Sequence, residues 1–478
     1  MNKKKSTDIP LYVDLDGTLI KTDLLFETFI EFIKKNPFNI LLSIKWLLEG
    51  KAYLKSKLAQ NTFIDIEKLP YNELFLSYLK NESNKGRKII LATGTNFTLA
   101  RRVSNYLKIF SDIIASDEEK NIKGKTKLTQ IMKNSGNSLF DYAGNSKNDL
   151  IIFKHSESSI LVNFNKQLLS LSAGIRVAKS FDSKSPLLRN LIIAIRPHQW
   201  VKNLLIFVPL FVSTQWYVPN LMIRALIGFI SYSLVASSVY VINDIFDIQN
   251  DRAHIKNRYR PFAAGDLAVG HGLIIFLFLA LSGLFVGYLL DIFYFFLLIA
   301  YVVLNLLYSI YLKSFVLIDI LILSQFYTLR VVSGGVITNI ELSFWLLAFS
   351  VFIFFSLAIA KRYTELMLSN DYNKKKIMGR GYTTNDLNIL NIMGVTNGYL
   401  AVLVLALYIN SPQVVLNYSN PKILWGVCVI FFFWISYVWI KANRGELEAD
   451  PITFAIKDRI SIVVFVLLII DVILAIII

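Results

Sequence analysis

Residues 222–251 read MIRALIGFISYSLVASSVYVINDIFDIQND, and they separate this chain from a soluble protein. The run 222–243 is apolar and long enough to cross the roughly 30 Å of bilayer hydrocarbon at about 1.5 Å per residue. Polar side chains then follow closely, at Asn243, Asp244, Asp247 and Asp251. The stretch therefore predicts a membrane-spanning helix that carries an amide and several carboxylates at one end.

The composition of the whole chain agrees with a protein partly dissolved in lipid. Of its 478 residues, 54% are hydrophobic and only 18% are charged, against about 25% in soluble proteins. This excludes a wholly soluble enzyme and a disordered protein. The net charge of +16 is typical of a nucleic-acid binder or of a membrane protein facing anionic headgroups. Because no basic face with interleaved aromatics lies outside the loops, we expect the bilayer and no nucleic acid as partner.

Apolar runs recur after Pro186 and predict about nine membrane helices. The expected spans are 188–212, 222–243, 270–290, 292–311, 315–338, 343–361, 393–410, 422–440 and 460–478.

The connections between these spans differ in charge. Lys and Arg gather in alternate loops, whereas the opposite loops hold little beyond Arg224 and Lys422. By the positive-inside rule, we expect the basic loops, the polar motifs and the N-terminal part on the cytoplasmic side of the inner membrane.

The N-terminal part alternates short strand-like runs with helical patterns, which predicts an α/β domain with a parallel, Rossmann-like sheet over residues 1–165. Residues 24–80 form a helical insertion after the first strand, 166–187 are a polar linker, and 188–478 are an all-α membrane domain. The expected strands are Leu11–Val13, Lys88–Ala92, Asp112–Ala115, Phe140–Ala143 and Ser159–Asn163.

Asp14-Leu15-Asp16-Gly17-Thr18 follows the first expected strand directly. Two carboxylates at a strand end can point into one crevice, where one attacks a phosphorus atom and the other handles the proton. An ordinary Asp-Gly turn is the alternative. Further pieces follow in order: Thr93 after the next strand, Lys127 as a cation for phosphoryl charge, and Gly144–Asp149, with oxygen ligands for Mg²⁺.

Together these motifs resemble the haloacid-dehalogenase (HAD) superfamily of Mg²⁺-dependent phosphatases. The resemblance implies Asp14 as nucleophile, Asp16 as general acid/base and residues 24–80 as a helical cap. It further implies Thr93 and Lys127 as phosphoryl ligands, and a metal site at Asp14, Asp16, Asn145 and Asp149. The family usually has Asp where Asn145 stands, which weakens Mg²⁺ binding, so a degenerate regulatory or structural domain is the alternative.

The second polar cluster follows residue 242. On a helix, Asn243, Asp247 and Asp251 lie four apart and share one face, with Asp244 in reach. Grouped carboxylates at a membrane boundary repel one another, and Mg²⁺ with a phosphorylated substrate would neutralise them. A solvated helix end is the alternative. The basic loop that follows offers Arg258 and Arg260 as guanidinium forks for phosphate.

This pattern resembles the UbiA-type intramembrane prenyltransferases, and within them the decaprenyl-phosphate phosphoribosyltransferase branch. The matching segments are Arg196–Asn203, Asn243–Asp251, Arg258–Gly265, Tyr308–Lys313, Leu329–Gly335 and Asp450–Asp458.

Aromatic prenyltransferases of that superfamily usually carry a second aspartate-rich motif in a loop after the sixth helix. Here that loop is expected at Lys361-Arg362-Tyr363-Thr364-Glu365. Extra cations suit a donor with an additional phosphate, although Lys361 and Arg362 are equally typical of a helix-end anchor. Arg330 and Lys202 lie within apolar spans, where charge is usually functional. The expected substrate contacts are Arg196, Lys202, Asn203, Arg258, Arg260, Lys313, Arg330, Lys361 and Arg362.

The sequence and these resemblances lead to one main hypothesis. The membrane domain transfers 5-phosphoribosyl from phosphoribosyl diphosphate to a polyprenyl phosphate, with Mg²⁺ at the aspartates, and the HAD domain removes the 5-phosphate of the product. Two alternatives stay open: prenyl transfer from a polyprenyl diphosphate to a small acceptor, and a non-catalytic transporter with a regulatory domain.

Overall fold

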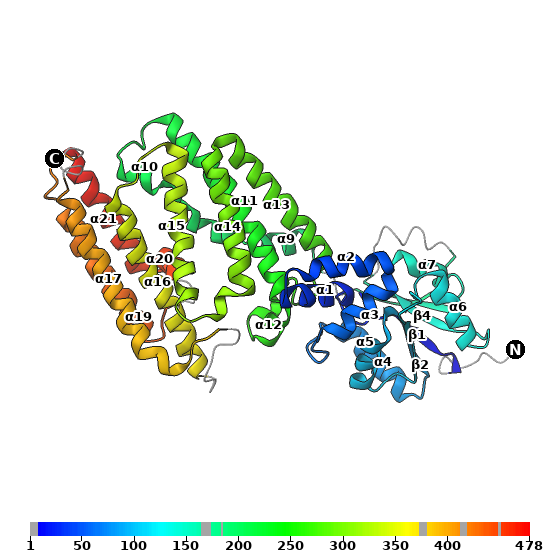
Figure 1. The fold of residues 1–478 in the computed structure, drawn as a ribbon. Coiled ribbons are helices and arrows are strands. Elements are labelled where there is room, and N and C mark those ends of the chain that lie inside the picture. The colour runs from blue at the N-terminus through cyan, green and yellow to red at the C-terminus, as the bar shows by residue number, and fades with distance from the viewer. Residues whose placement is uncertain (1–7, 164–173, 183–184, 372–379, 412–417, 448–450) are drawn as a thin grey trace. The chain divides into compact units, whose positions relative to one another are not determined.

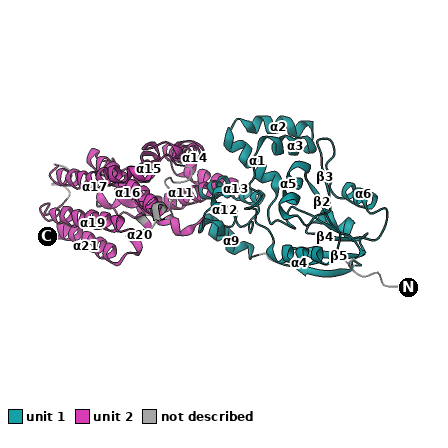
Figure 2. Ribbon diagram, turned by 90° about the horizontal axis from the view of Figure 1, so that it is seen from below, with its two compact units in different colours: residues 1–195, 240–275 teal, residues 196–239, 276–478 magenta. Residues whose placement is uncertain are grey.

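The computed structural model describes residues 8–163, 174–182, 185–371, 380–411, 418–447 and 451–478. The chain forms two compact units, shown in teal and magenta in Figure 2. The first unit contains Met1–Ile195 and Tyr240–Ile275, and the second contains Arg196–Val239 and Phe276–Ile478. Residues 166–173 and 183–184 of the expected linker, and Asp450 of the last matching segment, lie outside the described residues.

A six-stranded parallel sheet forms the centre of the N-terminal part (Figure 1), in the order β3-β2-β1-β4-β5-β6. The central strand is fully buried because Leu11, Tyr12 and Val13 are apolar on both faces, as in covered parallel sheets. The predicted Rossmann-like α/β fold is therefore confirmed. The strands are β1 (Leu11–Val13), β2 (Ile89–Asn96), β3 (Asp112–Ser116), β4 (Asp141–Gly144), β5 (Ser158–Val162) and β6 (Val177–Phe181).

Strand β6 lies in the segment that the sequence predicted to be a linker, so that prediction is wrong for residues 177–181. The strand pairs with β5 alone and its side chains are mostly exposed. An edge strand of this kind has no buried apolar run, which is the signal that the other five strands gave.

The helical insertion divides into two parts. Helix α4 (Glu73–Asn84) belongs to the sheet's own core, where Phe75 and Leu79 are fully buried with Leu91 of β2. Helices α1 (Leu24–Lys35), α2 (Asn39–Glu49) and α3 (Lys51–Asn61) form the cap, with a small separate core around Phe32 and Leu58. The remaining helices of this part are α5 (Phe97–Leu107), α6 (Lys125–Asn134), η2 (Lys147–Asp149) and α7 (Leu150–Phe153).

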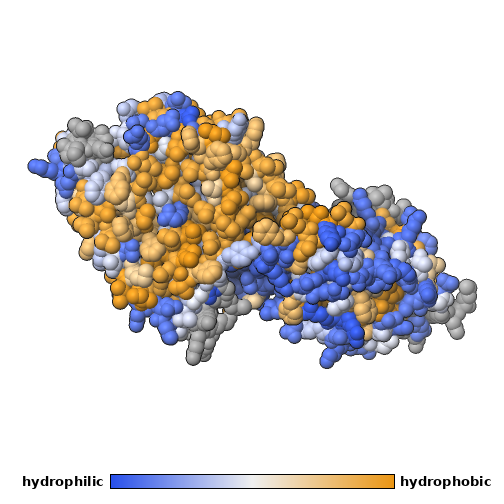
Figure 3. Space-filling model, viewed as in Figure 1, coloured by the Kyte–Doolittle hydropathy of each residue, from blue (hydrophilic) through white to orange (hydrophobic). Residues whose placement is uncertain are grey.

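Within the described residues, eight helices are long and apolar enough to cross a membrane. Figure 3 shows the apolar surface that such helices present. They are α11 (Pro219–Phe246), α13 (Val269–Leu290), α14 (Ile292–Ile310), α15 (Ile318–Thr338), α16 (Phe344–Asp371), α17 (Leu387–Ile409), α19 (Trp425–Asn443) and α21 (Arg459–Ile477). Shorter elements connect them: α12 (Ile248–Ala253), η5 (Asn257–Tyr259), η6 (Leu312–Ser314), η7 (Thr384–Asp386) and α20 (Pro451–Lys457).

The first of the nine predicted spans, 188–212, is not one helix. The chain forms α9 (Leu187–Ile195), the 3₁₀ segment η4 (Pro197–Phe207) and α10 (Val208–Val212). Arg196 adopts φ of +54°, and Pro197 follows it. A residue before proline is disfavoured in the helical region, which explains the break. Hydropathy averaged over the whole span does not register this effect, although the polar residues Arg196, His198 and Gln199 flank the proline.

Helix α16 is longer than predicted. The expected end at residue 361 is wrong, because the helix continues through Asp371 and places Lys361–Glu365 on a helix rather than in a loop. Arg362 and Glu365 form an i,i+3 ion pair, with Nη1 2.5 Å from Oε2. Charges that are paired along a helix let it continue where a charge run alone suggested an end.

A buried ion cluster holds α4 to the sheet. Arg87 donates to Glu82 (Nη1 to Oε2, 3.1 Å) and to Asp141 of β4, and its side chain is 3% exposed. Its Nε also donates to the carbonyl of Ile9 (2.9 Å). One guanidinium thus satisfies two buried carboxylates and a main-chain oxygen.

We expect Arg87→Met to lower the free energy of unfolding of the α/β part by about 3–5 kcal/mol, because two buried carboxylates lose their cation. Limited proteolysis of the full chain across a temperature series would measure this. Lys85→Met is the matched control: Lys85 pairs with the same Glu82 but is 62% exposed, so little change is expected. Equal sensitivity of both variants would contradict the assigned role.

Candidate functional site

The two carboxylates of the first motif lie directly after β1, at the carboxyl edge of the sheet. Asp14 accepts from Lys127 Nζ at 2.8 Å and from Thr18 Oγ1 at 3.4 Å. Asp16 accepts from the amide of Leu24 at 3.1 Å and from Thr95 Oγ1. Burial raises the pKa of Asp14 to about 6 and the pKa of Asp16 to about 7. An acid that keeps its proton near neutral pH suits Asp16 for proton transfer.

Lys127 connects the first aspartate to the motif after β4. Its Nζ lies 3.6 Å from Asp149 Oδ1 and donates to the hydroxyl of Tyr142 at 3.1 Å. Burial works against its charge, but Asp14 and Asp149 outweigh it and raise the pKa of Lys127. Predicted residues from β1, α6 and the β4 loop are therefore brought together.

Asp149 is held firmly in its loop. It accepts from Tyr142 (2.6 Å) and from the amide and hydroxyl of Ser146 (2.9 and 2.6 Å). Burial acts to raise the pKa of Asp149, but Lys127 and these hydrogen-bond donors outweigh burial and lower the pKa. The carboxylate therefore stays ionised, as a metal-site residue requires.

Asn145 packs against the turn that follows the nucleophile candidate. A Cβ built on Gly17, which has φ of +75°, would lie 2.0 Å from Asn145 Nδ2. Gly17 is therefore needed both for the turn and for this close approach. The amide side chain of Asn145 offers an oxygen but no negative charge at a position where the HAD superfamily usually has Asp.

Thr93 is fully buried, and its Oγ1 accepts from the amide of Thr95 at 3.0 Å. The sequence analysis missed Thr95, which bonds Asp16, and Lys55 of α3, which donates to the carbonyl of Gly94 at 2.5 Å. Burial lowers the pKa of Lys55. Thr95 lies on the same strand as Thr93, β2, and was open to prediction. In contrast, no local signal distinguished Lys55 among the lysines of the insertion.

The first unit contains a cavity of about 1060 Å³. Its polar lining includes Asp14, Asp16, Asn145 and Asp149, and the cap contributes Lys51 and Lys55. Its apolar wall comes from Leu25 and Phe26 of α1 and from the first turns of α13, including Val269, Leu273 and Ile274. The residues predicted to handle phosphate thus share a cavity with the beginning of a membrane-spanning helix.

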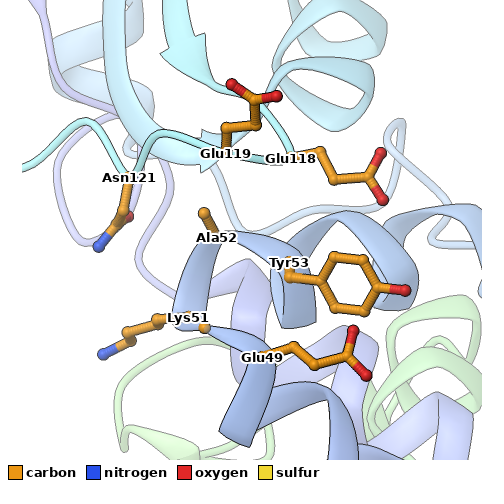
Figure 4. Close-up of a pocket in the computed structure, with 8 residues that line it drawn as sticks. Glu49, Lys51, Ala52, Tyr53, Glu118, Glu119 and Asn121 are labelled. Carbon is orange, nitrogen blue, oxygen red and sulfur yellow. The ribbon is translucent and has the colours of Figure 1, made fainter.

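A smaller hollow of about 520 Å³ lies between the turn joining α2 to α3 and the segment after β3 (Figure 4). Glu49, Glu118 and Glu119 line it together with Lys51, Tyr53 and Asn121. None of the predicted site residues lies there.

The second aspartate cluster begins where α11 ends. The amide of Asp247 bonds the carbonyl of Asn243 (2.9 Å), and that of Asp251 bonds the carbonyl of Asp247 (2.8 Å). The four-residue repeat therefore continues across the joint between α11 and α12, as the sequence predicted. Arg260 Nη1 lies 3.2 Å from Asp244 Oδ1 and 2.8 Å from Asp251 Oδ2. Two predicted metal ligands thus converge on one cation.

The donor set of this cluster fits Mg²⁺. No three His, Cys, Asp or Glu side chains in the described ranges are already arranged around a metal position. However, two carboxylates that reach one guanidinium nitrogen can reach an ion placed there, and Asn243 and Asp247 add oxygens. Burial raises the pKa of Asp251 to about 6, with Asp244 and Asp247 adding to the rise and Arg260 opposing it. A divalent ion would relieve this repulsion.

The next residue, Arg252, faces the cap. Its guanidinium bonds Glu27 of α1 through two contacts, Nη1 to Oε2 at 2.8 Å and Nη2 to Oε1 at 2.6 Å. Both side chains are at most 5% exposed, and Thr22 also donates to Glu27 (2.5 Å). Within the first unit, the cap helix is therefore tied to the aspartate segment by a bidentate, buried ion pair.

Arg330 lies in the interior of the second unit, 2% exposed within α15. Its Nε donates to Asn203 Oδ1 at 2.8 Å, and its guanidinium lies 5.0 Å from the ring centre of Tyr232 and 5.4 Å from that of Tyr301. Lys202 lies 6.0 Å from the ring of Tyr327, next to the same helix. Three predicted substrate-binding residues are therefore grouped in an aromatic environment, which favours cations.

Close packing between η4 and α15 makes this grouping possible. A Cβ on Gly334 would lie 2.0 Å from the carbonyl oxygen of Ile206, so only glycine fits there. Arg330 stands four residues before Gly334 and therefore near the same face of α15.

Arg362 belongs to a second cluster. It is fully buried and bonds Asp319 of α15, Glu365 and the hydroxyl of Tyr308 (2.8 Å). Arg380 Nη1 also lies 2.9 Å from Asp319. The sequence analysis missed Asp319, because a single aspartate near a helix start is a common capping pattern. Binding of substrate by Arg362 stays a prediction.

The other predicted contacts are spread along the chain. Arg196 directly precedes η4, Lys313 lies in η6, and Lys361 lies in α16 beside Arg362. Arg258 lies in η5 and donates to Tyr259 Oη at 2.6 Å. Their roles toward substrate stay predictions.

Comparison with known proteins adds independent findings. The model of the UbiA prenyltransferase family matches residues 204–466. The Sinorhizobium fredii protein y4nM is 34% identical over 458 residues, which covers 95% of this chain and 88% of that protein. The decaprenyl-phosphate phosphoribosyltransferase of Mycobacterium tuberculosis is 32% identical over 275 residues, covering 56% of this chain and 87% of that protein.

Two solved structures resemble different parts of the chain. A UbiA homologue from Archaeoglobus fulgidus bound to GPP and Mg²⁺ covers 59% of this chain and 99% of that chain, at 14% identity and a TM-score of 0.46. A HAD family hydrolase from Salmonella enterica covers 37% of this chain and 70% of that chain, at 12% identity and a TM-score of 0.28.

We expect Asp319→Asn to destabilise the second unit strongly, on the order of 3 kcal/mol, because Arg362 would keep a buried charge without its carboxylate. Thermal unfolding of the full chain in detergent would measure the change. Lys441→Met, which breaks the exposed pair with Glu446, is the control. If Asp319→Asn melts like the parent protein, the cluster is not a structural element.

Proposed function

The chain belongs to the UbiA prenyltransferase family, and on that premise we propose that it transfers a 5-phosphoribosyl group from phosphoribosyl diphosphate to a polyprenyl phosphate. The observation that carries the proposal is the buried group of Lys202, Asn203 and Arg330 among tyrosines. Burying a cation deep in an apolar helix costs free energy, so such a residue usually serves a function. Guanidinium and ammonium groups are the usual partners of phosphate.

The relatives support this choice of substrate. Decaprenyl-phosphate phosphoribosyltransferases from more than one genus match the membrane part over most of their own length. The prenyl-transfer alternative requires a second aspartate-rich motif, and the corresponding stretch is the helical Lys361–Glu365, with two cations and one carboxylate. A donor that carries a 5-phosphate in addition to its diphosphate has more negative charge than a prenyl diphosphate. The two cations of this stretch therefore favour phosphoribosyl diphosphate as the donor.

Asp244, Asp247, Asp251 and Asn243 would hold Mg²⁺, which supplies charge neutralisation for a leaving diphosphate. Arg260, which bonds two of these carboxylates, stands ready to contact diphosphate oxygens. The lipid phosphate attacks C1 of the ribose while the diphosphate departs, with inversion at C1. A phosphate monoester is anionic at pH 7, so the nucleophile needs no general base. The basic loops and this segment would lie on the cytoplasmic side of the inner membrane.

Asp247→Ala should reduce transfer by at least about 10²-fold, the scale of losing one stabiliser of developing charge. The assay follows radiolabel from phosphoribosyl diphosphate into the lipid phase with polyprenyl phosphate and Mg²⁺. Glu341→Gln, an exposed acid between α15 and α16, is the control and should transfer normally. Near-normal turnover of Asp247→Ala would show that the motif is not the metal site.

The same preparation tests the choice of donor. Unlabelled phosphoribosyl diphosphate should compete with the labelled donor, and geranyl diphosphate should not. Equal or reversed competition, or transfer of the prenyl group of labelled geranyl diphosphate to a small acceptor, would favour the prenyltransferase alternative.

A second activity is favoured by the cavity of the first unit. We propose that the HAD part removes the 5-phosphate from the lipid-linked product, because one cavity joins Asp14, Asp16 and Lys127 to the first turns of α13. Asp14 attacks the phosphorus, and Asp16 protonates the departing C5 oxygen of the ribose. Asp16 then takes a proton from the water that hydrolyses the phospho-aspartate, releasing inorganic phosphate. Mg²⁺ held by the acidic edge would neutralise phosphoryl charge.

Asp14→Asn should leave ribosyl transfer unimpaired and stop the sequence at the 5-phosphorylated lipid, whereas the parent protein yields the lipid-linked ribose. Mass spectrometry of the extracted lipid distinguishes the two products. Glu119→Gln, which removes an exposed acid from the smaller hollow, should behave like the parent. If the parent protein itself yields only the phosphorylated lipid, the proposed phosphatase activity is wrong, and the loss of Mg²⁺ binding caused by Asn145 would explain it.

A further inference from the structure

Helix α2 of the cap has an unusual surface for a helix outside the membrane-spanning set. Its sequence, Asn-Ile-Leu-Leu-Ser-Ile-Lys-Trp-Leu-Leu-Glu, is mostly apolar, yet Ser43 is its only buried residue. The exposed apolar side chains include Leu41 at 63% and Leu48 at 84%, and the full set is Ile40, Leu41, Leu42, Ile44, Leu47 and Leu48, with Phe38 just before the helix. Figure 3 shows the orange patch at this place on the mostly blue α/β part.

Five of these side chains share one face. At 100° per residue, Ile40, Leu41, Ile44, Leu47 and Leu48 fall within an arc of about 120°. The opposite face packs on the cap: Trp46 stacks on Phe32 with ring centres 5.0 Å apart, and Asn39 Nδ2 donates to the carbonyl of Phe32 at 2.8 Å. The helix is therefore fixed by its narrow polar and aromatic side, and its wide apolar side is turned outward. We call the latter the α2 face.

Water is an unfavourable surrounding for this face. Removing a Leu or Ile side chain from water is favourable, and contiguous exposed patches of this kind mark a docking surface. The charge around the face indicates which partner it meets. Lys45 is exposed on α2 itself, Lys35 ends α1 and Lys51 begins α3. An apolar stripe edged by lysines matches an anionic bilayer surface, with acyl chains for the leucines and headgroups for the ammonium groups.

The cap also adjoins a helix that enters the bilayer. Phe26 of α1 packs against the start of α13, where a Cβ on Gly270 would lie 3.5 Å from its ring. Lys21 Nζ pairs with Asp266 at 3.5 Å, three residues before α13 begins. These contacts lie within the first unit. They keep the cap close to the membrane boundary of the same chain, which makes lipid the nearest apolar phase.

We propose that α2 is an interfacial helix that inserts the α2 face into the bilayer in which α13 is embedded. Interfacial helices of this kind bury their apolar side about 5–10 Å into the boundary between headgroups and acyl chains. Inserted in this way, the cap holds its cavity against the lipid surface and admits a phosphorylated headgroup while its acyl chain stays in the bilayer.

The test uses depth-dependent quenching in the full chain. Cys428 is the only native cysteine, so Cys428→Ala provides a background for single labels. Leu48→Cys carries a bimane fluorophore, and the protein is reconstituted in vesicles of phosphatidylcholine and phosphatidylglycerol that contain doxyl-labelled lipid. We expect the bimane emission to shift to the blue and to lose most of its intensity. Lys85→Cys, at the end of α4, is the matched control and should remain unquenched.

Three outcomes would overturn the proposal. An unquenched label at position 48 in water-like surroundings means that the face stays in solvent. A blue-shifted but unquenched label means that protein covers it, and concentration-dependent self-quenching in detergent would identify a second copy of the chain. Full quenching that persists after Ile44→Glu and Leu41→Glu are added would show that the apolar face does not cause the insertion. These readouts require no catalysis, so they stand or fall separately from the activities proposed above.

Discussion

The cost of taking charge out of water governs how this protein is built. Lys127 lies between Asp14 and Asp149, Arg87 joins Glu82 to Asp141, and Arg362 joins Asp319 to Glu365. Each cation is nearly or fully buried and would be prohibitively unstable alone. The fold therefore draws segments from distant parts of the sequence to one point wherever a charge is enclosed. A buried carboxylate that must be neutralised can also accept a metal ion or a protonated group, which is the role predicted for Asp14 and Asp149 in the first of these clusters.

The buried ion pair between Arg252 and Glu27 links the aspartate segment to the cap. Asp251 faces Arg260 and the aspartate cluster, while its neighbour Arg252 faces the cap. Because both partners are buried, the pair resists separation more strongly than an exposed ion pair would. The two chemical motifs of the first unit are thus connected through adjacent residues of one short helix. Neither motif alone predicted this contact, since the two partners lie 225 residues apart.

Local pattern determined much of this architecture. Five strands were predictable because each is a short apolar run, and the DxDGT turn was predictable because strand ends and Asp-Gly turns have strong local signals. Seven of the eight long membrane helices needed only hydropathy, and α16 needed correction at its end. The pairing of Asn243, Asp247 and Asp251 on one face followed from helical spacing alone.

The parts that escaped prediction depend on distant neighbours. Strand β6 pairs with one neighbouring strand only. The 188–212 segment is interrupted because a proline follows Arg196. Asp319 is recognised as part of a buried cluster only through its ion pairs with Arg362 and Arg380. Lys55 of the cap is distinguished from the other lysines only by its hydrogen bond to the carbonyl of Gly94, which the folded structure provides.

The first turns of α13 begin a membrane-spanning helix and also form a wall of the cavity of about 1060 Å³. A phosphatase centre of the kind proposed above would therefore stay at a fixed distance from the lipid. Such a centre would select a headgroup by how far its phosphate stands from its membrane anchor, as well as by its charge. Enzyme and substrate would then meet in the plane of the bilayer instead of throughout a volume of solution.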